Sequence, residues 1–571
     1  MSNHKLLLGC ILGIASCIGP AVIAQTSSAQ TQAKASIPHL EKRGQATQLI
    51  VAGKPWLMLS GELHNSSPSN AEYMRPIWKK LADMNLNTVI GAASWELIEP
   101  EEGHFDFSSV DMQITEAHKH GLKLVLIWFG IWKSTSGSYA PMWVKTDPAR
   151  FPMVQTSSGH QKMPFGVSFE GISVFGKDIL ASDAKAFRAL MRHIRATDTD
   201  HTVLIMQVEN ETGMFGDNRD RSPLAEEAWS KPVPPELLSY LADHKANLTP
   251  ALSRAWGSQG FQTKGTWADV FGKDATAGEI FMAWHFARAI EFLTETGKSE
   301  LALPMYTNGW LGPVANMIEP GQYPSGGPVA GMLDIWRAAA PKVDMLSPNL
   351  YSPDFQGICA QYARPDNPLF IPETYVSVPN LFWAIGHHAA LGYSPFGIDN
   401  ISSEALGSAY KTLGALAPLI LSHQSEGEVM AVLQGNDASV KEFEDATGLS
   451  LKFGDVASVM APPSAKKPAE KSDEKKIPAT DQAPVFGQTA KDDRGFAIVI
   501  RTKPNQFIIA GSGILIRSSK AKIGTVDEIL IERGQPIPGR RLNGDETFSG
   551  NLFTLDVDQL AVRKITTYSL Q

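Results

Sequence analysis

Cysteine and long hydrophobic runs are scarce in this chain, and each absence excludes a class of protein. Only three of the 571 residues are cysteine, too few for a disulfide-stapled scaffold, and Cys10 and Cys17 both lie in an N-terminal leader. No run beyond that leader is long and apolar enough to predict a membrane-spanning helix. A glycine-rich phosphate loop is missing, and the absence of a Gly-x-Ser-x-Gly turn argues against a serine α/β-hydrolase.

Charge of either sign is modest. Lys and Arg number 51 against 59 Asp and Glu, which gives a net charge of -8, and charged residues make up 19% of the chain. This balance does not predict nucleic acid as a partner. Hydrophobic residues make up 43%, enough to form a sizeable core, and this excludes an intrinsically disordered chain.

The first 24 residues predict an export signal rather than part of the fold. Lys5 precedes an apolar stretch over residues 6–15 that is too short to cross a bilayer. Val-Ile-Ala at residues 22–24 is typical of a signal-peptidase site, whereas Ile-Ala-Ser-Cys at residues 14–17 resembles a bacterial lipobox. We therefore expect a periplasmic or secreted protein, with a lipid-anchored outer-membrane lipoprotein as the alternative. Residues 25–44 predict a flexible tether.

Eight short apolar runs alternate with helix-like stretches between about residues 55 and 400. Apolar strands separated by amphipathic helices are typical of a parallel sheet that is covered on both faces. Eight such strands predict a (β/α)8 TIM barrel, which we place at residues 45–420. A doubly wound open sheet is the alternative, but no Gly-x-Gly-x-x-Gly follows the first strand to support it. The runs are residues 56–60, 88–92, 122–129, 203–208, 303–307, 343–347, 369–372 and 392–397.

One connection in this barrel is unusually long. Residues 214–297 follow the fourth strand and far exceed an ordinary strand-to-helix connection of about 2–6 residues. We expect an ordered helical insertion there, with Trp229 or Trp256 shaping the part of the site beyond the first sugar.

The rest of the chain, residues 421–571, has a different pattern. Short β-like runs separated by turn residues predict an antiparallel C-terminal β domain. Residues 461–484 are rich in Pro, Lys, Glu, Asp, Ser and Ala, and predict a disordered loop within it. The β-like runs are residues 428–434, 496–501, 506–509, 513–517, 525–532 and 552–560.

Two strand candidates end in carboxylates. The fourth leads into Glu-Asn-Glu, with Glu211 last, and the seventh leads into Glu373. The carboxyl ends of barrel strands meet at the catalytic face, so we expect the two glutamates to lie close together. A carboxylate pair suits glycoside hydrolysis, in which one group protonates the leaving oxygen and the other attacks the sugar or activates water. The alternative is that each glutamate is paired with an Arg or Lys inside the barrel.

Three motifs around these strands support the hydrolytic interpretation. Residues 207–213 read Gln-Val-Glu-Asn-Glu-Thr-Gly and residues 60–64 read Ser-Gly-Glu-Leu-His. Residues 95–107 contain Trp-Glu-Leu-Ile-Glu-Pro followed by Gly-His-Phe-Asp-Phe. These motifs resemble, in order, the Q-[IV]-E-N-E-Y-G signature, the first-strand S-G-E-[IL]-H and the second-strand pattern of glycoside hydrolase family 35, the β-galactosidases. The resemblance extends over roughly residues 45–400.

This resemblance implies roles for individual residues. Glu211, which follows the asparagine, would be the acid/base, and Glu373 would be the nucleophile. Asn210 matches an asparagine that hydrogen-bonds the sugar 2-hydroxyl, and Tyr375 matches a tyrosine that contacts the sugar. No metal or other cofactor is implied.

The resemblance is incomplete at the first and third strands. Asn65 stands where the family has tyrosine, and residues 128–133, Trp-Phe-Gly-Ile-Trp-Lys, replace the family's R-P-G-P-Y-x-x-A-E-W. The eighth-strand segment at residues 390–399 is similar to glycoside hydrolase family 42. We therefore expect a divergent bacterial branch that leans towards that family.

Several other residues at strand ends are candidates for sugar contacts. Glu62 and Glu96 would hold sugar hydroxyls, or alternatively form structural ion pairs. Tyr351 would hydrogen-bond the nucleophile, with core packing as the alternative. Trp128 and Trp310 are the tryptophans that we expect to stack on sugar faces.

Glu209 lies two residues before Glu211. On a regular strand the two side chains point the same way. We expect Glu209 to be an orienting or salt-bridged group below the acid, and it is the alternative acid if Glu211 is not.

Together these observations predict an exported, retaining exo-β-galactosidase that releases terminal galactose from oligo- or polysaccharides, such as xyloglucan side chains. Another β-glycosidase of the same clan, acting on arabinopyranosides or fucosides, is the first alternative. A barrel that binds glycans without hydrolysing them is the second. The sequence does not predict an oligomeric state.

Overall fold

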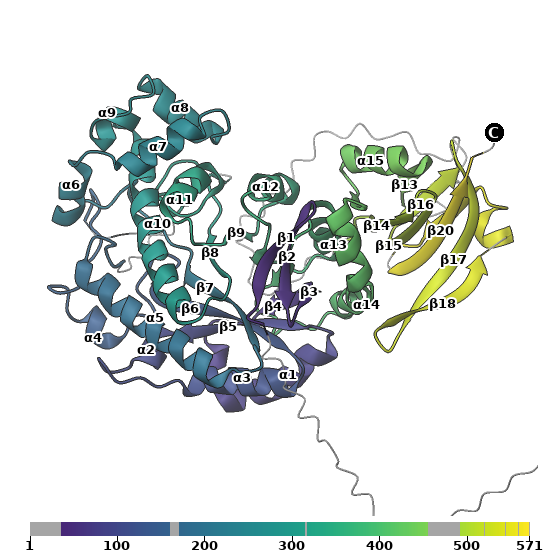
Figure 1. Ribbon diagram of the computed structural model, residues 1–571, viewed down its shortest axis with the longest axis horizontal. Helices are drawn as coiled ribbons and strands as arrows, with labels where there is room; N and C mark the ends of the chain where they lie inside the picture. The colour runs from purple at the N-terminus through teal and green to yellow at the C-terminus, as the bar shows by residue number, and fades with distance from the viewer. Residues whose placement is uncertain are drawn as a thin grey trace, which may run out of the picture. The chain divides into compact units, whose positions relative to one another are not determined.

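Eight parallel strands close into a barrel in the order β10-β11-β4-β5-β6-β7-β8-β9 (Figure 1). The computed structural model describes residues 36–159, 161, 171–314, 317–454, 492–518, 520–542, 544–557 and 559–569. The barrel confirms the predicted fold class and all eight strand candidates. Its strands are β4 (Met58–Glu62), β5 (Thr88–Ser94), β6 (Lys123–Lys133), β7 (Val203–Asn210), β8 (Met305–Gly309), β9 (Met345–Leu350), β10 (Ile371–Thr374) and β11 (Gly392–Pro395).

Helices follow the barrel strands and bury apolar faces against them. In α5, residues at helical spacing such as Phe187, Leu190, Met191 and Ile194 are all buried, which is the pattern of a helix with one face on a core. The long helix α10 is buried on most sides, because it packs against α5, α9 and α11 as well as β7. The helices of this layer are α1 (Ala71–Asp83), α2 (Trp95–Ile98), α3 (Ser108–Lys119), α4 (Met142–Lys145), α5 (Lys177–Thr197), α10 (Ala275–Glu300), α11 (Leu333–Ala339), α12 (Phe355–Tyr362), α13 (Val378–His388) and α14 (Glu404–Glu426).

The long segment after β7 folds as the predicted helical insertion. It contains α6 (Pro223–Trp229), α7 (Pro235–Asp243), α8 (Pro250–Ser258) and α9 (Trp267–Phe271). The expectation that Trp256 contacts substrate is wrong, because its side chain is 1% exposed and its indole N–H donates to the Gln262 carbonyl. Trp229 also packs internally, since the Arg219 guanidinium lies over its ring and Phe281 meets it edge-on.

A small antiparallel sheet precedes the barrel. It consists of β1 (His39–Arg43), β2 (Ala46–Val51) and β3 (Lys54–Trp56). Leu49 and Val51 of β2 join the apolar residues that fill the barrel interior, such as Met58 of β4. The predicted tether therefore ends earlier than residue 44, because β1 already pairs with β2.

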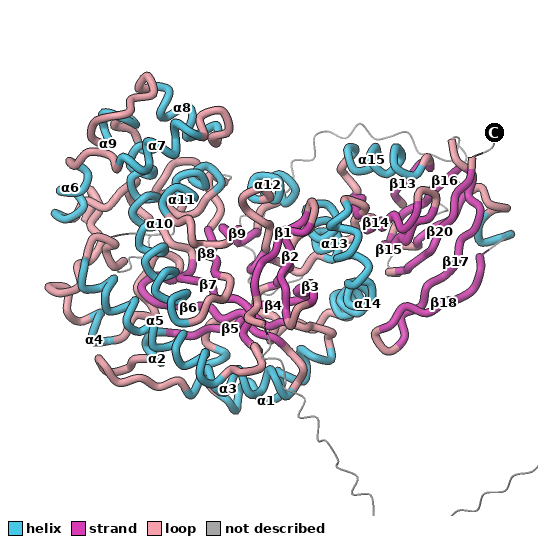
Figure 2. Tube along the Cα trace, in the orientation of Figure 1, coloured by secondary structure: helices cyan, strands magenta, loops and turns pink. Residues whose placement is uncertain are grey.

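The C-terminal region is an antiparallel β domain (Figure 2). A six-stranded sheet has the order β12-β14-β15-β20-β17-β18, and a second sheet has the order β13-β16-β19. The segment predicted as a disordered loop, residues 461–484, lies outside the described residues. The elements are β12 (Val429–Leu433), α15 (Asp437–Thr447), β13 (Leu449–Phe453), β14 (Phe496–Lys503), β15 (Gln506–Ser512), β16 (Ile514–Ser518), β17 (Lys522–Glu532), β18 (Gln535–Leu542), β19 (Leu552–Leu555) and β20 (Ala561–Tyr568).

The six-stranded sheet packs against α13, the helix that follows β10. Phe382 of α13 meets Phe496 of β14, and a Cβ added at Gly386 would lie 2.8 Å from the Cβ of Ala431. Arg494 also donates to the side chain of Asn380 at 2.6 Å. The C-terminal domain therefore supports the helix that follows the strand carrying Glu373.

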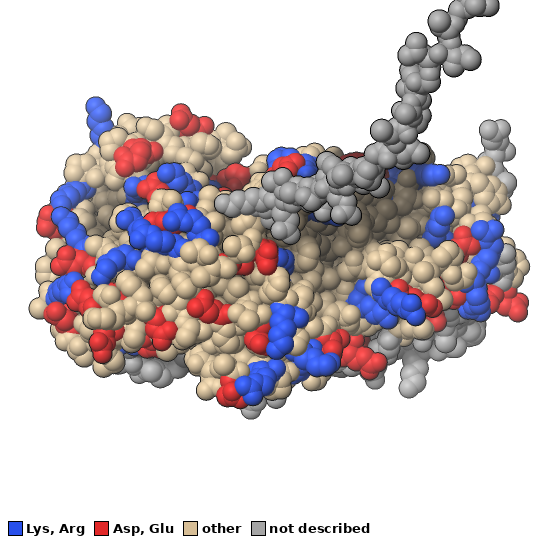
Figure 3. All heavy atoms as spheres, turned by 60° about the horizontal axis from the view of Figure 1, so that its bottom comes forward, with Lys and Arg blue, Asp and Glu red and all other residues tan. Residues whose placement is uncertain are grey.

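No helix among the described residues is long and apolar enough to cross a membrane. Acidic and basic side chains are interspersed over the face seen in Figure 3.

Candidate functional site

The two glutamates predicted to form a pair meet at the carboxyl ends of β7 and β10. A single amide nitrogen joins them, because Nδ2 of Asn349 donates to Oε1 of Glu211 at 2.8 Å and to Oε2 of Glu373 at 2.6 Å. Glu211 and Glu373 are each 5% exposed. The alternative of a lysine partner holds in part for Glu211, which lies 3.8 Å from Nζ of Lys133, whereas Glu373 has no ion pair among the described residues. Both carboxylates nevertheless share one bridging amide.

A second asparagine orients Asn349. Asn308, on β8, donates from Nδ2 to Oδ1 of Asn349 at 2.9 Å, so the Nδ2 of Asn349 must face the two carboxylates. The Oδ1 of Asn308 accepts the backbone N–H of Glu211 at 2.9 Å. Strands β7, β8, β9 and β10 are therefore tied together at the level of the carboxylate pair. Neither Asn308 nor Asn349 was among the predicted site residues.

Two tyrosines lie beside Glu373. The hydroxyl of Tyr351 donates to its Oε1 at 2.7 Å, as expected for this residue. The ring of Tyr375 meets the ring of Tyr351 edge-on, with centroids 4.6 Å apart. Both tyrosines thus lie next to the carboxylate pair, and a sugar contact for Tyr375 stays a prediction.

The other oxygen of Glu211 faces the end of β6. Ser134 donates its hydroxyl to Oε2 of Glu211 at 2.6 Å, and Nζ of Lys133 lies 3.8 Å from the same oxygen. Lys133 also donates to the Ser134 hydroxyl at 2.9 Å. Sequence reasoning missed both residues, although a lysine that ends an apolar strand is as unusual as a glutamate in that position.

The expectation that Glu209 and Glu211 share a face is wrong. Both residues have positive φ angles, 61° and 50°, which costs an L-residue roughly 1–2 kcal/mol each and breaks the alternation of the strand. Glu209 turns away from the mouth and accepts the backbone N–H groups of residues 130, 131 and 132 at 3.2, 2.9 and 2.7 Å. It also hydrogen-bonds to Asp183, and burial raises the pKa of Glu209 well above its usual value.

Glu209 therefore orients the segment that carries Lys133 and Ser134 to Glu211, which confirms the orienting role. Glu209→Leu should leave three buried N–H groups without an acceptor, lowering the free energy of unfolding by roughly 3 kcal/mol or more. Glu209→Gln keeps one acceptor oxygen and should cost less. Urea unfolding of the two variants checks this, and equal stabilities for Glu209→Leu and the unchanged protein would contradict it.

The two further glutamates occupy different places. Glu62, at the end of β4, is 1% exposed, and its carboxyl interacts electrostatically with Glu373, Lys133 and Glu211. Glu96 instead lies in an ion pair with Lys145 at 3.5 Å, with its side chain 39% exposed. Glu62 thus faces the site, whereas Glu96 forms the structural ion pair that was the alternative to a sugar contact.

The tryptophans divide in the same way. The expectation for Trp128 is wrong, because the side chain is fully buried, its N–H donates to Asp183 at 2.7 Å and its ring packs on Phe187 of α5. It therefore points into the helical layer rather than the barrel mouth. Trp310, directly after β8, is partly exposed and meets Phe215 edge-on, so stacking on a sugar stays a prediction for it.

Asn210 is buried beside Glu211, yet neither its Nδ2 nor its Oδ1 has a hydrogen-bond partner among the described residues. A buried amide without partners costs free energy unless a ligand or water satisfies it. This geometry suits the predicted contact with a sugar hydroxyl.

The two carboxyl groups titrate in contact with each other. Burial, followed by the charge of Glu211, raises the pKa of Glu373 to about 7, although Lys133 and the Tyr351 hydroxyl act to lower it. Because the two groups are joined through Asn349, a titration near pH 7 belongs to the pair, which loses a proton as the pH rises through this value.

If catalysis needs that proton, kcat/KM for a substrate with a poor leaving group should fall as the pH rises through about 7. In Glu211→Gln this basic limb should disappear for a nitrophenyl glycoside, because the variant has no acid to deprotonate. Glu279→Gln is the matched control, since burial raises the pKa of Glu279 on α10 to about 7 as well. Loss of the limb in the control would assign it to Glu279 instead.

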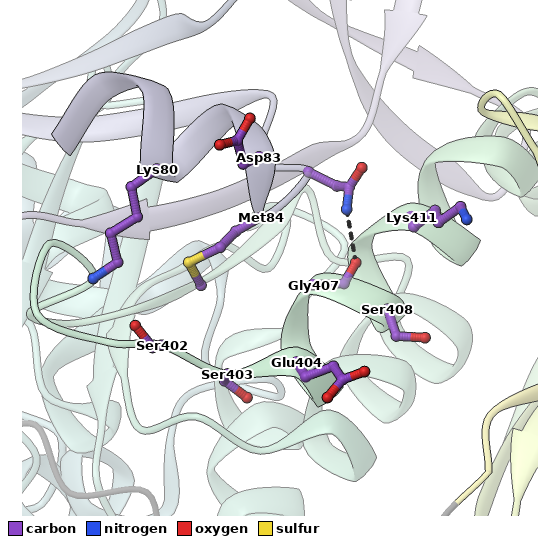
Figure 4. Close-up of a pocket in the computed structure, with 10 residues that line it drawn as sticks. Lys80, Asp83, Met84, Ser402, Ser403, Glu404, Gly407, Ser408 and Lys411 are labelled. Carbon is purple, nitrogen blue, oxygen red and sulfur yellow. Dashed lines mark hydrogen bonds between the residues drawn. The ribbon is translucent and has the colours of Figure 1, made fainter. Parts of the chain in front are cut away.

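A separate cavity of about 730 Å³ lies between α1 and α14 (Figure 4). Lys80 and Asp83 come from α1 and Glu404 and Lys411 from α14, and the side chain of Asn85 donates to the Gly407 carbonyl at 3.1 Å. None of its lining residues belongs to the carboxylate pair or its neighbours, so this cavity is not the site described above.

Residues 68–271 match the family profile described as beta-galactosidase, glycoside hydrolase family 42. Over these residues the barrel is similar to the β-galactosidases of that family. The matched residues include Asn210 and Glu211, whereas Glu373 lies beyond them. Residues 406–554, most of the C-terminal domain, match a family described as a domain of unknown function, DUF5597.

The chain is also similar to individual proteins over part of its length. A β-galactosidase of Xanthomonas manihotis is 29% identical over 182 residues, which are 30% of this chain and 27% of that protein. The chain thus spans about a quarter of that relative. Among solved structures, the β-galactosidase of Marinomonas ef1 is 12% identical, with 64% of this chain and 61% of that chain covered and a TM-score of 0.43. The β-galactosidase of Bacillus circulans sp. alkalophilus is 14% identical, with 64% of this chain and 57% of that chain covered and a TM-score of 0.42.

Proposed function

We propose that this β-galactosidase-like barrel is a retaining exo-β-galactosidase. The observation that carries the proposal is the bridge from Asn349 to both glutamates. Their bridged oxygens can be no farther apart than the sum of 2.8 and 2.6 Å, about 5.4 Å. Retaining glycosidases hold their carboxyl groups about 5–5.5 Å apart, whereas inverting enzymes need about 6.5–9.5 Å to admit a water.

In the first step, Glu373 attacks the anomeric carbon while Glu211 gives its proton to the leaving oxygen. The nucleophile loses its charge as the ester forms, and Glu211 is left as a carboxylate beside Ser134 and Lys133, which stabilise it. In the second step Glu211 takes a proton from water, which attacks the anomeric carbon and releases Glu373. The amide of Asn349 donates to both carboxylates, so it can stabilise the negative charge on Glu373 before the first step and on Glu211 after it.

Terminal galactose is the sugar that we propose for the first subsite. The family match supports a β-galactoside, and the burial of Glu211 and Glu373 suits a sugar that is held at a chain end. Galactosylated side chains of xyloglucan are the polymeric substrate we propose, on the basis of the family resemblance alone.

Hydrolysis of a panel of nitrophenyl glycosides and galactosylated oligosaccharides tests this function. We expect turnover of the β-galactoside, with the β-anomer of galactose released first. Preference for an arabinopyranoside or fucoside would identify another β-glycosidase. Galactose binding without turnover of any glycoside would identify a glycan-binding barrel.

We further propose that the protein is exported, on the basis of its first 24 residues. Mass spectrometry of the mature protein tests this: a chain that begins at Gln25 indicates ordinary cleavage, and one that begins at an acylated Cys17 indicates a lipoprotein. A mature chain that retains Met1 would contradict export.

A further inference from the structure

Glu62 has an unsatisfied oxygen that faces the site. The side chain ends β4, where residues at alternate positions such as Met58 face the barrel interior. Its Oε2 is buried and has no hydrogen-bond partner within the described part of the chain. Burial, with the neighbouring charge of Glu373, raises the pKa of Glu62 well above its usual value. A carboxyl group in this position gains most from a ligand that brings its own hydrogen-bonding group.

Lys133 faces the same space from the end of β6. One of its three N–H bonds goes to Ser134, and the ammonium lies 3.8 Å from Glu211 and 5.9 Å from the centre of the Phe129 ring. Its charge also interacts with Glu373, Glu62 and Tyr139. A lysine held by one hydrogen bond retains donors for a ligand.

The strand between these two residues ends in small side chains. β5 lies between β4 and β6 in the barrel and ends in Gly-Ala-Ala-Ser at residues 91–94. Ala92 faces the interior, in the same apolar cluster as Ile90 and Phe129. Small side chains here contrast with the long side chains of Glu62 and Lys133 on either side. The two long polar side chains therefore flank a strand end of small residues, and both interact electrostatically with the carboxylate pair.

We propose that Glu62 and Lys133 form a clamp for the hydroxyls at C3 and C4 of the galactose. A sugar hydroxyl is both a donor and an acceptor, so it can donate to the Glu62 carboxyl while it accepts from the Lys133 ammonium. The proposal rests on the proposed function. In it, Glu62 and Lys133 distinguish the axial C4 hydroxyl of galactose from an equatorial one. It also assigns a role to Lys133, at the point where the chain departs from the third-strand pattern of family 35.

The position of the carboxylate pair indicates which hydroxyls the clamp meets. The anomeric carbon must lie between Glu211 and Glu373, which come from β7 and β10. In a pyranose ring, C4 lies across from C1. The clamp is on β4 and β6, away from the asparagines of β8 and β9, so the edge with C3 and C4 is the part of the ring that it faces.

Deoxygenated substrates test the clamp. We would measure kcat/KM for nitrophenyl β-galactoside and its 2-, 3-, 4- and 6-deoxy analogues with the unchanged protein, Lys133→Met and Glu62→Gln. In the unchanged protein, loss of the 3- or 4-hydroxyl should lower kcat/KM roughly 10- to 100-fold. In either variant, deletion of the same hydroxyl should lower kcat/KM only a few-fold, because the side chain that binds this hydroxyl is already missing. The 2-deoxy penalty should be the same in all three proteins.

Lys145→Met is the matched control, since that lysine pairs with Glu96, and its penalties should equal those of the unchanged protein. If Lys133 only adjusted the charge of the carboxylate pair, Lys133→Met would lower kcat/KM by the same factor for all five substrates. That result would overturn the clamp. Coupling to the 2- or 6-hydroxyl alone would overturn it too. If Lys133→Met does not fold, Glu62→Gln carries the same test. Absence of turnover of any galactoside by the unchanged protein would instead refute the proposed function.

Discussion

Replacing Glu373 by alanine is expected to lower kcat by roughly 10⁴-fold or more on every substrate, including those with activated leaving groups. Among the described residues at the site, no other carboxylate is placed to take over this role, because Glu62 lies on another strand and Glu209 is turned towards the backbone of residues 130–132. Azide should restore turnover by filling the space of the missing carboxylate. Since that is a single displacement from the nucleophile's own face, the product should be the α-galactosyl azide.

Glu211→Ala provides the contrast. A nitrophenolate leaves with little protonation, so the first step should persist and the glycosyl-enzyme should accumulate. Azide needs no general base, and its attack on that intermediate should give the β-galactosyl azide. Chromatography and proton NMR distinguish the two products. A β-galactosyl azide from Glu373→Ala together with an α-galactosyl azide from Glu211→Ala would show that the roles are assigned wrongly. Full activity in either variant would show the same.

Asn349→Leu is expected to have the second largest effect. It removes the only side chain that donates to both carboxylates among the described residues, and it leaves Nδ2 of Asn308 without its acceptor. Loss of one preorganised donor at a reacting charge costs about 10²–10³-fold in kcat. Steady-state kinetics on nitrophenyl galactoside measures this directly.

Asn308→Ala is the graded comparison, because Asn308 acts on the carboxylates only by orienting Asn349 and the backbone of Glu211. Its effect on kcat should be clearly smaller than that of Asn349→Leu. A loss below about tenfold for Asn349→Leu, or a larger loss for Asn308→Ala, would contradict the role of the bridging amide.

The barrel could be predicted from the sequence because its strands are buried on both faces. Such strands read as uninterrupted apolar runs, for example residues 203–208, and these stand out between amphipathic helices. The final strand β20 could not be predicted in this way, since two adjacent charged residues, Arg563 and Lys564, separate Val562 from Ile565, and this pattern is neither an apolar run nor a strict alternation. Part of the predicted run at 552–560 belongs instead to the turn after β19.

The carboxylate pair could also be predicted, because a charged residue at the end of an apolar strand has few structural explanations. The bridge between the two could not, since Asn349 is separated from Glu211 by 138 positions and only the closure of the barrel brings them together. The outward turn of Glu209 depends on a positive φ angle, and alternation along a strand gives no signal for it. Trp128 was misplaced because an aromatic residue on a barrel strand can face either the interior or the helical layer.

The double-displacement mechanism is tested most directly by trapping its intermediate. Incubation with a 2-deoxy-2-fluoro-galactoside that has an activated leaving group should inactivate the enzyme and add one fluorogalactosyl group, because the fluorine slows both steps and the leaving group restores only the first. Peptide mass spectrometry should place this group on Glu373. A label on Glu211, Glu209 or Glu62, or turnover of galactosides with no covalent label and with α-galactose released first, would contradict the mechanism.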